Sequence, residues 1–165
     1  GDTVLLSGRV LTARDAAHKR LIALLRAGEP LPIDIRDTVV YYAGPCPAPP
    51  GMPIGARGPT TSSRMDSMTP ELVRLGQRVL IGKGPRGPEV LTALRECGGL
   101  YLAAVGGAGA LYARCVKSAR VAAFEDLGAE SIKELIVEDM PLIACTDLYG
   151  GNLYQSGPAQ FAREP

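Results

Sequence analysis

The stretch from Gly58 to Arg64, GPTTSSR, gathers residue types that together can bind a small anion. Four consecutive hydroxyl side chains follow Pro59, and the stretch ends on an arginine. Hydroxyls and free backbone N–H groups at a turn or helix start form a ready anion site. A guanidinium adds a planar fork that fits a carboxylate. The alternative interpretation is a capped helix with a surface arginine.

Two further cations stand where an anion could reach them. Arg14 falls in the first turn of a predicted helix, where a positive charge opposes the helix macrodipole by about 0.3–1 kcal/mol, and a bound anion would offset that cost. Lys83 lies between two glycines at the end of a predicted strand, where open α/β sheets often bind ligands, although an ordinary turn lysine gives the same pattern. His18, one turn beyond Arg14, is either a pocket residue or, like most lone histidines, a structural one.

The cysteines argue against a metal centre built by this chain. Cys46, Cys97, Cys115 and Cys145 form no C-x-x-C pair, and the single histidine, His18, is near none of them in the sequence. A structural zinc site needs clustered ligands, and an iron–sulfur cluster needs three or four thiolates at short spacings. We therefore expect no metal ligand here, and reduced thiols of a cytoplasmic protein.

Apolar periodicity and turn residues predict the elements that must position these side chains. Strands are predicted over residues 1–10, 38–43, 79–81, 100–105, 121–124, 134–137, 142–146 and 152–154. Helices are predicted from an N-cap at Thr12 to Gly28, from Thr69 onward, over 88–97, and from the turn at 106–109 through Val116. Because no strict βαβ rhythm appears, we expect an α/β fold with a mixed sheet and helices packed on it.

The segment 44–59 holds six prolines and four glycines, which forbid regular structure. A linker of this composition would separate two foldable halves, but the 43 residues before it make a thin domain. We therefore expect an ordered loop that crosses one face of a single domain spanning residues 1–165.

Composition excludes several classes of partner. Lysine and arginine total 18 against 17 acids, aromatics make up 5% and tryptophan is absent, so neither a nucleic-acid surface nor a base-stacking platform is expected. The longest uncharged stretch, 100–113, is too short for a bilayer span and is broken by glycines. With no secretory signal pattern at the N-terminus, we expect a cytoplasmic protein without a membrane partner.

Several motifs together resemble one known family. They are TARDAAHKRL (12–21), YYAGPCPAPPG (41–51), GPTTSSRMDSMTPEL (58–72), IGKG (81–84), AAVGGAGAL (103–111), EDLGAES (125–131) and NLY (152–154). In this order they resemble the β subunit of two-chain class I fumarate hydratase, an iron–sulfur hydro-lyase whose single-chain members carry the same region as a C-terminal domain. The resemblance runs over nearly the whole chain.

The resemblance implies a swivelling β/β/α fold and reversible hydration of fumarate to L-malate. It also implies a hetero-oligomer in which a partner α subunit, and not this chain, holds a [4Fe–4S] cluster. In the family, the matching residues Arg14, Thr60, Arg64 and Lys83 bind the dicarboxylate, and Thr60 acts as the base in its alkoxide form. Nearby cations, Arg64 above all, would stabilise that alkoxide. The family also carries a short segment upstream of Gly1.

Other interpretations stay open at this point. The L-tartrate dehydratase β subunit shares motifs similar to GPTTS and IGKG, and a methylfumarate-type substrate fits the same charges. The segments 44–51, 125–131 and 152–154 favour the fumarase branch. A non-catalytic dicarboxylate-binding or structural module is the alternative from another class. All four residues that would bind the substrate are present, which argues against a purely structural protein that has lost its site: Arg14, Thr60, Arg64 and Lys83.

Overall fold

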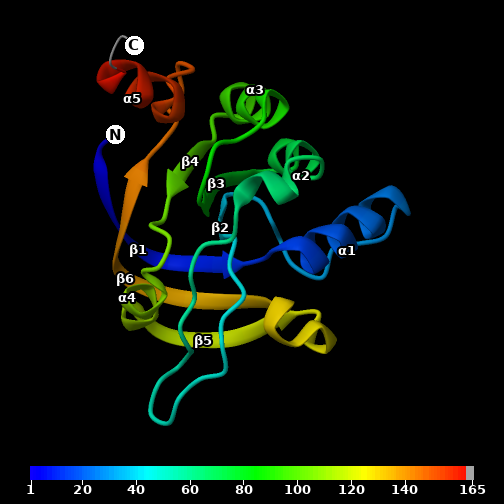
Figure 1. Cartoon of the computed structure of the whole chain (residues 1–165). Helices are drawn as coiled ribbons and strands as arrows, with labels where there is room; N and C mark the ends of the chain where they lie inside the picture. Colours follow the sequence, from blue (N-terminus) through cyan, green and yellow to red (C-terminus); the bar gives the residue numbers. More distant parts are fainter. Residues whose placement is uncertain (163–165) are drawn as a thin grey trace.

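The computed structural model describes residues 1–162, and in this range strands and helices pack as an α/β fold (Figure 1). The strands are β1 (Thr3–Thr12), β2 (Thr38–Tyr41), β3 (Gln77–Gly82), β4 (Leu100–Ala103), β5 (Val116–Ala123) and β6 (Ile132–Ala144). The helices are α1 (Asp15–Arg26), α2 (Thr69–Arg74), α3 (Pro88–Cys97), α4 (Gly109–Arg114) and α5 (Leu153–Phe161). Two 3₁₀ helices, η1 (Ser62–Met65) and η2 (Glu125–Glu130), complete the set.

The six strands form one mixed sheet in the order β1-β2-β3-β4-β6-β5, which confirms the predicted class. Strands β1 to β4 run parallel, and β6 is antiparallel to β1, β4 and β5. Because β6 pairs with both β4 and β1, five of the strands close into a ring and β5 extends it beside β6. The long strand β1 follows this curve through a register shift between Leu6 and Gly8.

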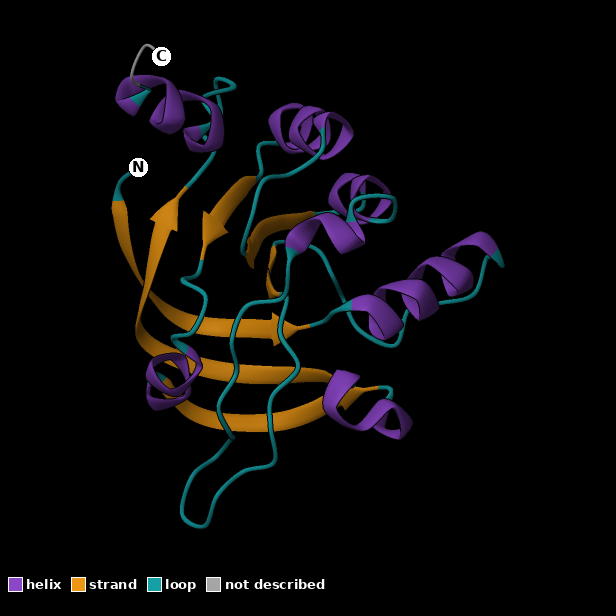
Figure 2. Cartoon of the chain, in the orientation of Figure 1, coloured by secondary structure: helices purple, strands orange, loops and turns teal. Residues whose placement is uncertain are grey.

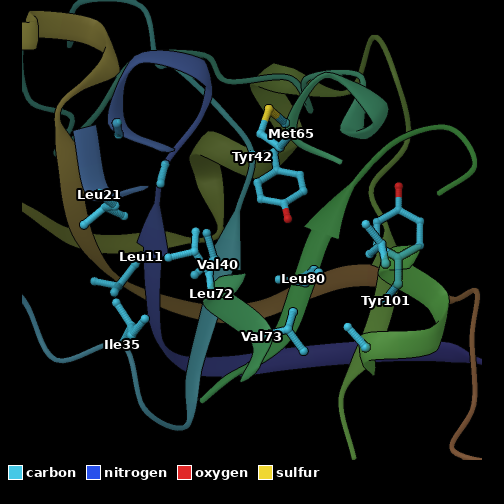
Figure 3. Close-up of a cluster of buried hydrophobic side chains, with 14 of the residues drawn as sticks. Leu11, Leu21, Ile35, Val40, Tyr42, Met65, Leu72, Val73, Leu80 and Tyr101 are labelled. Carbon is cyan, nitrogen blue, oxygen red and sulfur yellow. The ribbon is translucent and has the colours of Figure 1, made fainter. Parts of the chain in front are cut away.

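Each face of the curved sheet has its own apolar core. Neighbouring strand residues alternate between the two cores, as Leu80 and Ile81 do, because successive side chains of a strand point to opposite faces. Helices α1, α2 and α3 cover one face, and Figure 3 shows that core, with Leu21 and Leu72 from the helix side.

The proline-rich segment and α4 cover the other face (Figure 2). Ile54 from the loop and Tyr112 from α4 are buried against the strands. A backbone hydrogen bond from Cys46 N to the carbonyl of Ala56 joins the two limbs of the loop at 3.0 Å. The prediction of an ordered loop crossing one face is therefore confirmed.

Several predicted boundaries were wrong, each for a local reason. The N-cap of α1 is Arg14 and not Thr12, because Thr12 completes β1 and its Oγ1 accepts a hydrogen bond from Lys133 N at 3.2 Å. The predicted strand at 152–154 is instead the start of α5, where the Asn152 side chain accepts a hydrogen bond from Tyr154 N. The short strands predicted on either side of Asp139 form one strand, β6, and β5 already begins at Val116.

The region from residue 1 to 162 contains no helix with both the length and the apolar character that a membrane span requires.

Candidate functional site

The predicted site residues gather at one edge of the sheet. Since β1 to β4 are parallel, their carboxyl ends lie on the same side, where open α/β sheets commonly bind ligands. Arg14 follows β1 and Lys83 follows β3, while Thr60 and Arg64 return to this edge from the loop. Arg14 and Lys83, which are 69 positions apart in the sequence, therefore lie at the same edge of the sheet.

Thr60 and Lys83 are held together through their backbones. Thr60 N donates to the carbonyl of Tyr42 at 2.6 Å, and the carbonyl of Thr60 accepts from Lys83 N at 3.4 Å. Thr61 pairs with Lys83 as a parallel bridge, and Ser62 N donates to the carbonyl of Lys83 at 2.9 Å. The segment 60–62 thus behaves as a short added strand, which fixes the direction of the Thr60 backbone.

This close approach depends on glycines in the turn around Lys83. A Cβ at Gly82 would overlap the Ser62 hydroxyl, which is buried and hydrogen-bonded to Tyr101 at 2.9 Å. A Cβ at Gly106, after β4, would lie 3.7 Å from Cδ of Lys83, so the lysine side chain passes over this residue. Gly82 therefore makes room for Ser62, while a side chain at Gly106 would make only ordinary van der Waals contact with Lys83.

Arg14 and Arg64 meet at one carboxylate, that of Asp15. Nε of Arg64 donates to Oδ1 of Asp15 at 2.9 Å, and Nε of Arg14 lies 3.5 Å from Oδ2. The Asp15 side chain is 20% exposed, whereas that of Arg64 is 51% exposed. The structure therefore brings these two predicted residues together, 50 positions apart in the sequence, with the Arg64 guanidinium open to solvent.

Glu130 of η2 closes the far side of Arg14. Its Oε1 lies 3.1 Å from Nη2 of Arg14, and its Oε2 accepts a hydrogen bond from Ala16 N at 2.9 Å. The second contact satisfies one of the unpaired N–H groups at the start of α1. On another side, a Cβ at Gly44 would lie 2.9 Å from Nη1 of Arg14, so a larger residue at this position would displace the Arg14 guanidinium.

The carboxyl end of β2 lies between Thr60 and Lys83 on one side and the Arg14 cluster on the other. The carbonyl of Tyr42 accepts from Thr60, the carbonyl of Tyr41 accepts from Ala13 N at 3.2 Å, and Gly44 touches the Arg14 side chain. Thr60 and Lys83 thus lie on one side of residues 41–44, and Arg14 with its carboxylates lies on the other. Three cationic side chains and a threonine with a fixed backbone around one strand end suit a small molecule with two negative charges.

His18 belongs to the core and not to the pocket surface. Its side chain is fully buried, its ring lies edge-on to Tyr42 at 5.3 Å, and its Nδ1 donates to the Arg14 carbonyl at 3.1 Å. Burial lowers the pKa of His18 to about 4, and the positive charge of Arg86 acts in the same direction. His18 is therefore a neutral structural residue beneath Arg14.

Arg86 anchors the segment that carries Arg64. Its buried guanidinium donates to Asp66 at 2.8 Å, to the Tyr42 hydroxyl at 3.2 Å and to the Thr69 hydroxyl at 3.0 Å. These bonds tie η1 and the start of α2 to the end of β2. Sequence reasoning missed this residue, because nothing within a motif links it to partners 17 to 44 positions away.

Sequence reasoning also missed the two carboxylates of the Arg14 cluster. Asp15 does carry a signal, since it stands directly after Arg14, but an acid at a helix start is common for reasons of helix stability alone. Glu130 carried none, because it reaches Arg14 from 116 positions further along the chain.

The thiols of the described chain do not fit an iron–sulfur cluster. Cys46 is exposed on the loop, Cys145 is buried, and Cys97 and Cys115 are half-buried on other elements. Over residues 1–162, no three side chains from the set His, Cys, Asp and Glu come together as metal ligands would. A [4Fe–4S] cluster needs three or four converging thiolates, and residues 1–162 do not supply them.

Comparison with known proteins gives the family of this chain. The family model described as "Fumarase C-terminus" matches residues 1–157. The chain is 39% identical over 152 residues to the anaerobic class I fumarate hydratase of Escherichia coli and 37% identical over 157 residues to fumarate hydratase 2 of Leishmania major. These matches cover 91% and 93% of the chain but only 28% of each relative.

A third relative is closer in size. The putative L(+)-tartrate dehydratase subunit beta of Methanocaldococcus jannaschii is 37% identical over 161 residues, which cover 94% of this chain and 83% of that protein. Together with the family match over almost the full length, these similarities show that the chain belongs to the fumarase C-terminus family.

Proposed function

We propose that this chain is the β subunit of a two-chain hydro-lyase that interconverts fumarate and L-malate. The observation that carries the proposal is the grouping of Arg14, Thr60, Arg64 and Lys83 around the carboxyl end of β2. Relatives named as fumarate hydratases support the choice of fumarate.

The three cations bind and orient the substrate in this proposal. A C4 dicarboxylate carries two negative charges, and Lys83 together with those arginine nitrogens that no protein carboxylate occupies can donate to its two ends. The terminal nitrogens of a guanidinium suit a carboxylate geometrically, and a lysine acts as a point charge. Substrate held in one orientation reacts as though the step were unimolecular, which is a large part of the rate enhancement available at such a site.

Thr60 handles the proton on carbon. Its hydroxyl is a weak acid, so it works as a base only if nearby positive charge stabilises the alkoxide. The backbone N–H of Lys83 donates a hydrogen bond to the carbonyl of Thr60, and Arg64 follows Thr60 by four residues in the same segment. In the dehydration direction, the Thr60 oxygen would take the proton next to one carboxylate of malate, the electron pair of that C–H bond would form the double bond, and hydroxide would leave the neighbouring carbon; in hydration, hydroxide would add and Thr60 would return the proton.

A partner chain completes the site in this proposal. Arg64 is half exposed, and the relatives named as fumarate hydratases are more than three times as long as the part of them that this chain matches. The relative from M. jannaschii is named as a subunit beta, which supports a separate α subunit. The [4Fe–4S] cluster would be held by that α subunit, since the thiols of the described part of this chain do not converge.

A second candidate substrate is L-tartrate. The observation favouring it is that the tartrate dehydratase relative matches this chain over 83% of its own length, far more than the fumarate hydratases do. The same cations would hold either dicarboxylate, so the two candidates share one site. Tartrate carries one hydroxyl more than malate, so the candidates differ in whether the site also binds a second hydroxyl.

The test is anaerobic co-expression of the chain with an α-like partner, followed by assays with fumarate and with L-tartrate. Turnover of fumarate by the pair and by neither chain alone is expected. A preference for tartrate would replace the substrate and keep the shared site. A cluster-loaded pair that turns over neither compound would refute the proposed reaction.

A further inference from the structure

Two guanidinium groups in the site share one counter-ion. Arg14 and Arg64 come from different elements, yet Asp15 faces the Nε side of both. Like charges this close repel by about 1 kcal/mol or more near a protein surface, unless a negative group lies between them. Asp15 is that group, and it is the one carboxylate paired with Arg64 over residues 1–162.

The position of Asp15 suits this role. It is the first residue of α1, where the helix macrodipole stabilises a negative charge. Its Oδ2 is buried and makes no hydrogen bond in the described chain, and the same holds for Nε of Arg14 opposite. These two unpaired buried atoms, Oδ2 of Asp15 and Nε of Arg14, lie 3.5 Å apart. A small movement of Arg14 would join them in a hydrogen bond and remove the free-energy cost of leaving both unsatisfied.

Glu130 supplies the second negative charge, so two cations face two carboxylates. Its Oε1 contacts the terminal Nη2 of Arg14, while its Oε2 is bonded to the backbone of α1. Glu130 therefore fixes Arg14 to the helix on one side and Asp15 faces it on another.

The contacts leave a particular part of Arg64 free. Asp15 occupies Nε, and no residue from 1 to 162 is hydrogen-bonded to the two terminal nitrogens, which lie on a half-exposed side chain. The terminal edge of a guanidinium is a planar donor fork for a carboxylate. Asp15 thus holds Arg64 at Nε, and the two terminal nitrogens stay available for a substrate carboxylate.

We propose that Asp15 is a positioning residue, which holds Arg14 and Arg64 at the separation that a dicarboxylate requires. This inference rests on the proposed function. Asp15 does not touch the substrate, and it acts through the two arginines. Because substrate and transition state carry the same carboxylates, its loss should raise KM far more than it lowers kcat.

The kinetic test uses Asp15→Asn in the reconstituted complex. The amide keeps an oxygen for Nε of Arg64 and removes the charge, so KM for fumarate should rise tenfold or more while kcat changes less than threefold. The matched control is Asp126→Asn, which removes the same charge from the exposed pair with Arg20 at 2.8 Å and should leave both constants unchanged. A KM within twofold of the unsubstituted complex would overturn the proposal.

A double-mutant cycle separates positioning from a general effect on folding. In a complex that already carries Arg64→Ala, the KM effect of Asp15→Asn should be clearly smaller, because one of the two arginines through which Asp15 acts is gone. A full tenfold effect on that background would overturn the proposal. If Asp15→Asn does not fold, Asp15→Glu keeps the charge and should retain KM within a few-fold, and a tenfold rise would contradict the inference.

A measurement without turnover distinguishes failure of this inference from failure of the proposed function. In NMR spectra of the chain, the Arg64 Nε–H signal should be protected from exchange with water and should lose that protection in Asp15→Asn. Equal exchange in both proteins would overturn the positioning role. Loss of protection together with no turnover of any dicarboxylate would refute the proposed reaction and leave the role of Asp15 supported.

Discussion

Acid should destabilise the chain through His18, the neutral histidine beneath the Arg14 cluster. Its Nδ1 proton is engaged by the Arg14 carbonyl, so a second proton must go to Nε2, which is buried and has no acceptor among the described residues. Burial lowers the pKa of His18 from 6.5 to about 4 in the folded chain. Between these values the unfolded chain binds the proton and the folded chain does not, so stability falls as the pH falls.

The magnitude follows from the two pKa values. Each pH unit over which only the unfolded state is protonated costs about 1.4 kcal/mol, which gives about 2 kcal/mol lost at about pH 5 and about 3 kcal/mol near pH 4. The assay is urea unfolding at about pH 7.5 and about pH 5, for the natural chain and for His18→Leu. The substitution leaves the Arg14 carbonyl satisfied, because the backbone N–H of residue 18 also donates to it at 2.9 Å.

The comparison uses the change between the two pH values, which cancels the packing effect of the substitution itself. His18→Leu should lose about 2 kcal/mol less than the natural chain on going from about pH 7.5 to about pH 5. An equal loss in both proteins would refute the argument, and so would a histidine NMR titration in the folded chain with its midpoint near 6.5.

Two further substitutions probe single contacts. Arg57 is 1% exposed, and its three guanidinium nitrogens have no hydrogen-bond partner within residues 1–162, so burial lowers its pKa to about 10. Arg57→Met should raise the free energy of unfolding at neutral pH by about 1–3 kcal/mol in urea titrations, since it removes an unpaired buried charge, and a loss of stability would contradict this. Gly44→Ala places a methyl group 2.9 Å from Nη1 of Arg14, the movable end of a flexible side chain. We expect it to raise KM at least fivefold with little change in melting temperature, and an unchanged KM would show that Arg14 tolerates displacement.

Short-range patterns were enough to predict most elements and the types of residue in the site. The helix after Arg14 and the helix over 88–97 follow from apolar spacing of 3.6 residues, and the loop after β2 follows from its prolines. The prediction that GPTTSSR binds an anion rests on its hydroxyls and an arginine in one short segment.

Long-range pairing could not be predicted in the same way. Glu130 reaches Arg14 only because β6 pairs with β1 in register, with Lys133 opposite Thr12, and no local pattern specifies that pairing. The same pairing places Thr12 inside β1 and moves the helix cap to Arg14. The long strand β6 was divided in the prediction, because Asp139 and Pro141 interrupt the apolar alternation although the strand continues through them.

The most direct test of the central claim is the turnover of fumarate by the reconstituted complex carrying Thr60→Ala. The matched control is Thr92→Ala, the same change on α3, where the side chain makes no hydrogen bond to another described residue. Since a positioned base contributes about 10²–10⁴-fold, kcat should fall by at least about a hundredfold in Thr60→Ala, with unchanged melting temperature and an unaffected control. Turnover within twofold of the unsubstituted complex would contradict the assignment of Thr60 as the base.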